Sequence, residues 1–173
     1  MKRQIQGFSL VELVAVTAVI GILAALALPD LADRAVKARV SEGLIFAGPF
    51  KAAVAESVTA TELDNNVNFA NGQVSSTNPS KYLTSIQANP STGVITIAYN
   101  PTNVGASGTL LLSPFVRSGA GSVETVATAF AAGRTGVIDW ACRGAGGSYA
   151  TATGMGAAGA GTLPERYSPA NCR

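Results

Sequence analysis

Residues 7–29, which decide the fold, read GFSLVELVAVTAVIGILAALALP. Apart from one serine, one threonine and Glu12, every side chain from Phe8 to Leu28 is apolar. As a helix these roughly 21 residues measure about 32 Å, whereas the hydrocarbon core of a bilayer is about 30 Å thick. The stretch is therefore predicted to be a membrane-spanning helix.

Two ordinary targeting segments explain this stretch less well. A cleaved secretory signal has a shorter apolar core that is followed by a small-residue cleavage site. Here the most obvious small residue at a boundary is Gly7, which precedes the apolar run. A plain signal anchor accounts for the length and for the basic start of the chain, MKRQIQ, but it does not account for Glu12.

The order of these features resembles the class III signal of type IV pilins. A short basic leader is followed by Gly7, by FSLVE, and by a long apolar helix that contains Gly21 and Pro29. In that family a prepilin peptidase cuts after the glycine and N-methylates the new terminal Phe. The resemblance is close over about residues 1–58, and it implies cleavage between Gly7 and Phe8 with methylation at Phe8.

Glu12 is the unusual residue of the apolar stretch. An unpaired charge deep in a bilayer costs at least roughly 2.5–3.5 kcal/mol, and such acids are functional more often than idle. After cleavage, the cationic amine of Phe8 on a neighbouring copy could meet Glu12, so that two costly charges neutralise each other. Glu12 would then set the register of assembly. The alternative is a protonated or hydrated Glu12 near the membrane interface, without a role.

The charge of the leader indicates the orientation of the predicted span, and the two cysteines agree with it. Lys2 and Arg3 form a positive flank that is expected to stay cytoplasmic, so that the chain after Pro29 lies on the other side. In a Gram-negative bacterium that side is the oxidising periplasm. The only two cysteines, Cys142 and Cys172, are then expected to form a disulfide. A zinc or thiol redox site would need more ligands or a C-x-x-C motif, and the sequence has neither.

Composition allows one modest domain beside the span and gives little support for catalysis or nucleic-acid binding. Of the 173 residues, 47% are hydrophobic and 13% are charged. The charge of +2 comes from 12 basic and 10 acidic residues, so loss of the two basic leader residues leaves 10 against 10. The sequence has no His, no nucleophile motif and no close acid pair in the later domain. No enzymatic activity, cofactor or metal is expected.

Helical periodicity continues beyond the span. One apolar stripe steps by three or four residues through Val36, Val40, Leu44, Ala47, Phe50, Val54 and Val58. Pro29 and Pro49 interrupt this pattern without ending it, so one long helix with two gentle kinks is predicted. Gly21 and Pro29 bound the weakest part of the span, and the resemblance implies that this part loses helicity on assembly.

Residues 59–81 are rich in Thr, Asn, Ser and Gly, and they are predicted to form an irregular loop between helix and sheet. Asp64, Asn66 and Asn68 imitate the start of a calcium-binding loop. Phe69 stands where such a loop needs Gly, and Ser75 stands where it needs an acid. Turn-forming polar residues are therefore the preferred interpretation.

Four strands are predicted after this loop, at residues 82–88, 93–99, 109–116 and 137–142, because these runs alternate or are rich in apolar and β-branched side chains. They are expected to form a small antiparallel sheet whose apolar face packs on the helical stripe. Trp140 is expected to pack in that core.

The C-terminal residues 143–173 are rich in Gly and Ala and are expected to form a surface loop, bounded by the disulfide, that buries little area. The letters GMGAAG at 154–159 match a dinucleotide-binding fingerprint. The match is accidental, because no strand precedes it and no crossover helix, second strand or distant acid follows it.

The predicted fold is therefore α+β: a long, kinked N-terminal helix whose first half is transmembrane, packed on an antiparallel sheet of about four strands, with a disulfide-bounded C-terminal loop. The predicted divisions are a leader (1–7), a transmembrane and polymerisation helix (8–29), an amphipathic continuation (30–58), a loop (59–81), a sheet (82–142) and the C-terminal region (143–173).

The resemblance implies the structural subunit of a type IV pilus, most like a major type IVa pilin. Its partners would be copies of itself, the prepilin peptidase, the pilus assembly platform of the inner membrane, and possible host-surface or DNA ligands. The subunit would lie in the inner membrane before assembly and in the extracellular pilus afterwards, where adhesion, twitching motility or DNA uptake follow. The alternatives are a minor pilin or secretion pseudopilin, and a monomeric membrane-anchored periplasmic binding module.

Overall fold

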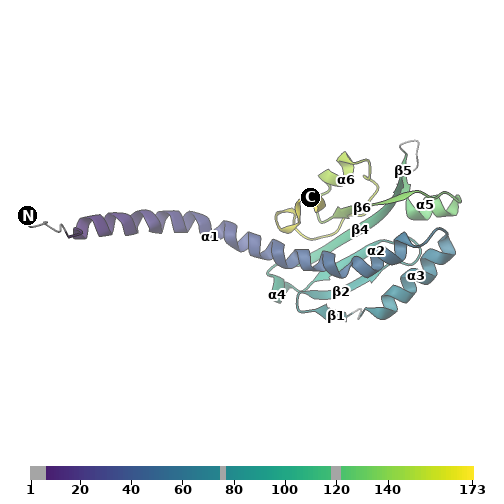
Figure 1. The fold of residues 1–173 in the computed structure, drawn as a ribbon, viewed down its shortest axis with the longest axis horizontal. Coiled ribbons are helices and arrows are strands. Elements are labelled where there is room, and N and C mark those ends of the chain that lie inside the picture. Colours follow the sequence, from purple (N-terminus) through teal and green to yellow (C-terminus); the bar gives the residue numbers. More distant parts are fainter. Residues whose placement is uncertain (1–6, 75–76, 118–121) are drawn as a thin grey trace, which may run out of the picture. The chain divides into compact units, whose positions relative to one another are not determined.

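The computed structural model of the chain describes residues 7–74, 77–117 and 122–173, and only the backbone of residues 29, 30 and 77 (Figure 1). The chain divides into two compact units, residues 1–35 and 36–173, and we call the second unit the head. Helix α1 (Leu10–Phe46) contributes residues to both units. Residues 1–6 of the predicted leader lie outside the described residues.

Helix α1 is long and apolar enough to cross a membrane, judged by length and composition. It runs without interruption through Gly21 and Pro29, so a bend at either residue stays a prediction. The helix continues past an interruption beside Pro49, as predicted. A single turn residue, Ala47, whose backbone stays helical (φ −75°, ψ −9°), separates α1 from helix α2 (Gly48–Ala55), which ends three residues before the expected residue 58. Pro49 lies in the first turn of α2, where its missing N–H costs nothing.

The apolar stripe predicted beyond residue 35 is largely confirmed. Val40, Ala47, Phe50 and Val54 are buried in the head, and Val36 and Leu44 pack against them. Val58, the last member, is 52% exposed because α2 ends three residues before it. The helical period that aimed the stripe at the sheet therefore stops with α2.

The predicted irregular loop at residues 59–81 is wrong, since most of it is helix α3 (Ala60–Gln73), which packs alongside α2 (Figure 1). The hydroxyl of Thr59 accepts a hydrogen bond from the backbone N–H of Glu62 at 3.2 Å, and the Glu62 carboxylate accepts one from Val58 N–H at 2.9 Å. This capping pair starts the helix. One face then buries Leu63, Val67 and Ala70, while the polar residues face outward.

Within the described parts of the chain, the antiparallel sheet has six strands where about four were predicted. Its strands are β1 (Thr77–Ser80), β2 (Leu83–Ala88), β3 (Ile95–Tyr99), β4 (Gly108–Arg117), β5 (Val123–Thr125) and β6 (Val137–Arg143). The order is β1-β2-β3-β4-β5, and β6 also pairs with β4. The predicted strands correspond to β2, β3, β4 and β6. Strands β1 and β5 escaped prediction because β1 contains a proline among polar residues and β5 has three residues.

One face of the sheet packs on the helices, whereas the opposite face is open along β2 and β3, where buried residues alternate with exposed ones. The larger core lies between the strands and the helices α1, α2 and α3, and Tyr99 anchors it by donating a hydrogen bond to the Val40 carbonyl at 2.8 Å. The described residues of the head also include three short helices: α4 (Pro101–Val104), α5 (Val126–Ala131) and α6 (Ser148–Ala152). Two 3-10 turns, Glu165–Tyr167 and Ala170–Cys172, follow near the end of the chain.

The C-terminal region buries more than expected. A second, smaller cluster joins Phe115 and Ala141 of the sheet to Ala150, Met155 and Ala158, and Leu163 is buried in the larger core. Glycine lets the backbone of this region approach strand β4 closely, because a Cβ on Gly161 would lie 2.1 Å from the Thr109 carbonyl oxygen. The predicted α+β class, with helix, antiparallel sheet and C-terminal disulfide, is nevertheless confirmed.

Candidate functional site: the N-terminal segment and the C-terminal disulfide

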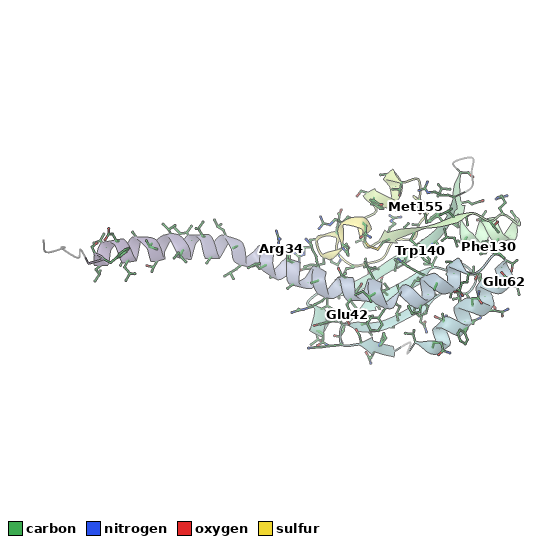
Figure 2. All side chains as sticks on the ribbon, viewed as in Figure 1. Arg34, Glu42, Glu62, Phe130, Trp140 and Met155 are labelled. Carbon is green, nitrogen blue, oxygen red and sulfur yellow. A yellow bond between two sulfur atoms is a disulfide. The ribbon has the colours of Figure 1, made fainter. Side chains whose placement is uncertain are left out.

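The described residues before 36 expose their apolar side chains. Large apolar residues from Phe8 to Leu31 are between 50% and 80% exposed, and in Figure 2 the side chains of this part of α1 project on all sides. Thr17 adds no unpaired donor, because its hydroxyl donates to the Val14 carbonyl at 3.0 Å. Taken by itself, the described part of this unit presents an apolar surface on all sides, as a membrane-spanning helix does.

Gly7 and Phe8 form the predicted processing junction, and both are exposed. A Cβ added to Gly7 would meet nothing within 4 Å, so packing within the chain does not require glycine there. Phe8 is 80% exposed, and helix α1 starts two residues after it. The junction is thus sterically open on the described chain.

Glu12 has a hydrogen-bond partner in its own chain that sequence reasoning missed. Its carboxylate oxygen Oε2 accepts a hydrogen bond from Ser9 N–H at 2.9 Å, and its own N–H donates to Ser9 Oγ at 3.2 Å. This reciprocal pair is a capping box. Its signature, Ser three residues before Glu at the start of an apolar helix, was available in the sequence.

The predicted disulfide is confirmed. Cys142 of β6 and Cys172 are bonded, both sulfurs belong to buried residues, and their Cα atoms lie 4.5 Å apart. The end of the chain is fixed further, because the Arg173 carbonyl accepts hydrogen bonds from Tyr149 N–H at 2.9 Å and from Ser148 Oγ at 3.1 Å. The C-terminal region is therefore part of the ordered head.

Charged groups on the head are mostly paired or packed. Arg117 pairs with Asp139, and Arg134 donates to both carboxylate oxygens of Glu124, which lowers the pKa of Glu124. The Lys51 ammonium lies 5.3 Å from the ring centre of half-buried Trp140, and burial lowers the pKa of Lys51. Trp140 thus packs at the margin of the core, close to the predicted position.

No metal or calcium site is assembled within residues 7–74, 77–117 and 122–173. No group of three His, Cys, Asp or Glu side chains converges there. Asp64, Asn66 and Asn68 lie along helix α3, so the resemblance to a calcium loop has no structural basis. Asn66 instead donates to the Ser57 hydroxyl at 3.0 Å.

Comparisons with known proteins agree with both halves of this description. The pilin family model, described as a bacterial filament protein, matches residues 36–173, and the prokaryotic N-terminal methylation motif matches residues 2–28. A crystal structure of a type IV pilin from Pseudomonas aeruginosa strain Pa110594 is similar, with a TM-score of 0.73 and 38% identity over 80% of this chain and 98% of that one.

Curated relatives point the same way over part of their length. The type IV major fimbrial protein FimA of Dichelobacter nodosus strain VCS1703A is 37% identical over 91 residues, 52% of this chain and 56% of its own. The type IV major pilin protein PilE of Neisseria gonorrhoeae is 37% identical over 100 residues, 57% of this chain and 59% of its own. The chain thus spans somewhat more than half the length of these relatives.

Proposed function

We propose that this chain, which belongs to the pilin family, is the processed structural subunit of a type IV pilus. One observation carries the proposal: residues 8–28 are exposed and almost entirely apolar, with residues 10–28 in helix α1, whereas the head buries its own core. A membrane covers such a helix before assembly, and equivalent helices of other copies cover it in a filament. Because the contact is head-to-tail and does not close, an open helical polymer results.

Processing is the first step of the proposed function. A prepilin peptidase cuts between Gly7 and Phe8 and methylates the Phe8 amine. The match of residues 2–28 to the methylation motif and the open junction at Gly7 support this step. The two basic residues of the leader leave with it, and a cationic amine appears at the start of the apolar helix.

Register is the second step, and Glu12 supplies it. The Phe8 amine of one copy pairs with the Glu12 carboxylate of another, because either charge alone is costly in an apolar bundle. Glu12 Oε2 accepts a hydrogen bond from Ser9 N–H. Among the described residues Oε1 has no hydrogen-bond partner, so it is available to the amine of another copy. Apolar side chains on both sides supply the association energy.

The location of the subunit before and after assembly follows from its N-terminal apolar segment, residues 8–29. Before assembly the subunit crosses the inner membrane once through residues 8–29, with the head in the periplasm and with access to the assembly platform. After assembly it belongs to the extracellular pilus. Gly21 and Pro29 are the residues at which the helix would loosen during this transfer. Adhesion to host surfaces, twitching motility and DNA uptake are the roles that this location permits.

The proposal is tested by two measurements on cells that make the filament. Intact mass and N-terminal sequencing of sheared filaments should show a chain that begins at methylated Phe8, whereas a Met1 terminus would contradict processing. Glu12→Ala should insert and be cleaved normally but yield no filaments. Glu56→Ala, which removes an exposed acid of the head, is the matched control and should assemble like the parent.

The outcomes also separate the alternatives. A minor pilin or pseudopilin would be processed in the same way but would be scarce in sheared filaments. A monomeric membrane-anchored binding module would tolerate Glu12→Ala, so full-length filaments or unchanged behaviour of that variant would overturn the proposed register.

A further inference from the structure

Ser9 has no role in the account so far, although it makes both contacts that hold Glu12. Its backbone N–H donates to Glu12 Oε2 at 2.9 Å, and its Oγ accepts from Glu12 N–H at 3.2 Å. The two residues are exposed, and the helix begins between them at Leu10. The acid is therefore turned back toward the start of the helix, the same end at which Phe8 lies.

Such an arrangement restricts a side chain that would otherwise be free. A glutamate on a helix surface has several rotamers, and fixing one of them at the moment of association costs free energy that lowers affinity. The bond from Ser9 N–H fixes the carboxylate beforehand. It occupies one oxygen and leaves Oε1 without a partner among the described residues.

We infer that Ser9 is a positioning residue for Glu12, which holds the carboxylate ready to accept the Phe8 amine of a second copy of this chain. The inference rests on the proposed function and deepens it. The Ser9 hydroxyl fixes the backbone at the start of the helix, the Ser9 N–H then orients the carboxylate, and the free oxygen receives the amine. No covalent step is involved.

A pair of β-branched substitutions isolates the hydroxyl. Ser9→Thr keeps an oxygen that can accept from Glu12 N–H, whereas Ser9→Val replaces that oxygen by a methyl group of similar size. Both variants and Glu12→Ala are made in the full chain. Intact mass of the cell-associated subunit checks cleavage and methylation, and the ratio of sheared filament to cell-associated subunit measures assembly.

We expect Ser9→Thr to assemble within about twofold of the parent and Ser9→Val to assemble about tenfold less, with cleavage and methylation complete in both. Equal assembly of the two variants would overturn the inference. Failure of Ser9→Val to be cleaved would also overturn it, because Ser9 would then serve the peptidase. If Glu12→Ala assembles normally, the proposed function fails; if only that variant is defective, the inference alone fails.

A second readout separates positioning from simple support of the helix. Filaments are grown from a mixture of subunits labelled with ¹⁵N-Phe and subunits labelled with ¹³C-Glu, so that contact between the terminal amine and a carboxyl carbon reports on neighbouring copies. In residual Ser9→Val filaments this contact should weaken and broaden, and in Ser9→Thr filaments it should match the parent. An undiminished contact in Ser9→Val would overturn the inference.

Discussion

Residues 7–35 and the head use apolar side chains in opposite ways, although one helix contributes to both. Before residue 36 the large side chains of α1 are exposed, whereas Val40 of the same helix is buried with Phe50 and Val54 of α2. The hydrophobic effect acts on both regions. The head buries its apolar side chains within one chain, whereas the N-terminal segment leaves its apolar side chains exposed. In the proposed function, burial of these exposed side chains between copies supplies the free energy of association.

The strongest way to break this comparison is to remove the N-terminal segment. A chain of residues 36–173 should lose membrane association and assembly completely, but it should keep the fold of the head because the core residues all lie after residue 35. Cooperative unfolding, followed by the fluorescence of the single tryptophan, Trp140, checks this. A truncated chain that failed to fold would show that the head depends on the segment before it.

The next largest effect comes from truncating one large apolar side chain to alanine in each region. Phe50→Ala should lower the free energy of unfolding of the head by about 3–5 kcal/mol, because it empties a fully buried position. Leu13→Ala, the control on the exposed segment, should leave it within about 0.5 kcal/mol of the parent. Denaturation of the full chain in detergent, followed through Trp140, makes the comparison. Similar losses in both variants would refute it.

Removal of the disulfide should have a smaller effect that is confined to the head. Cys142→Ala combined with Cys172→Ala should lower the free energy of unfolding by about 2–4 kcal/mol, since the bond closes a loop with a sequence separation of 30. Thermal unfolding of the variant and of the reduced parent measures the loss. A loss of the membrane-bound subunit with an unchanged head would argue that the bond serves the N-terminal segment instead.

The smallest expected effect is a pH dependence that comes from an exposed pair. Because Arg134 lowers the pKa of Glu124 in the folded state, the contribution of Glu124 to stability is present above the ordinary glutamate range and is lost as the pH falls through the lowered value. The Arg134 side chain is 52% exposed and that of Glu124 is 18% exposed, so solvent reaches the pair and screens it. Glu124→Gln should flatten the acid limb of the stability profile slightly, and an unchanged profile would rule out this assignment.

The sequence pattern was sufficient to predict an element wherever its apolar side chains recur with a regular helical or strand period. The long apolar run, the stripe through Val40 and Phe50, and four strands that alternate or are rich in apolar residues are read directly from the side chains, and two cysteines allow a single pairing. The same reasoning identified Gly7, Phe8 and Glu12, whose roles in processing and register stay predictions.

The rest depended on contacts that a pattern of polar and apolar letters does not contain. Helix α3 looked like a loop because its buried face has only Leu63, Val67 and Ala70 among polar neighbours. The C-terminal region looked too poor in apolar residues to pack, yet glycine at position 161 lets its backbone approach strand β4. The Ser9–Glu12 contact is the exception, because the sequence S-x-x-E at the start of an apolar run is the signature of a capping box.

The central claim is that copies of the chain cover the exposed N-terminal helix and that Glu12 sets their register. A helical reconstruction of sheared filaments at side-chain resolution tests it most directly. The account predicts residues 8–28 in the filament interior, with the Phe8 amine of one copy within salt-bridge distance of the Glu12 carboxylate of another. Helices on the filament surface, or a Glu12 whose only partner is Ser9 of its own chain, would contradict it.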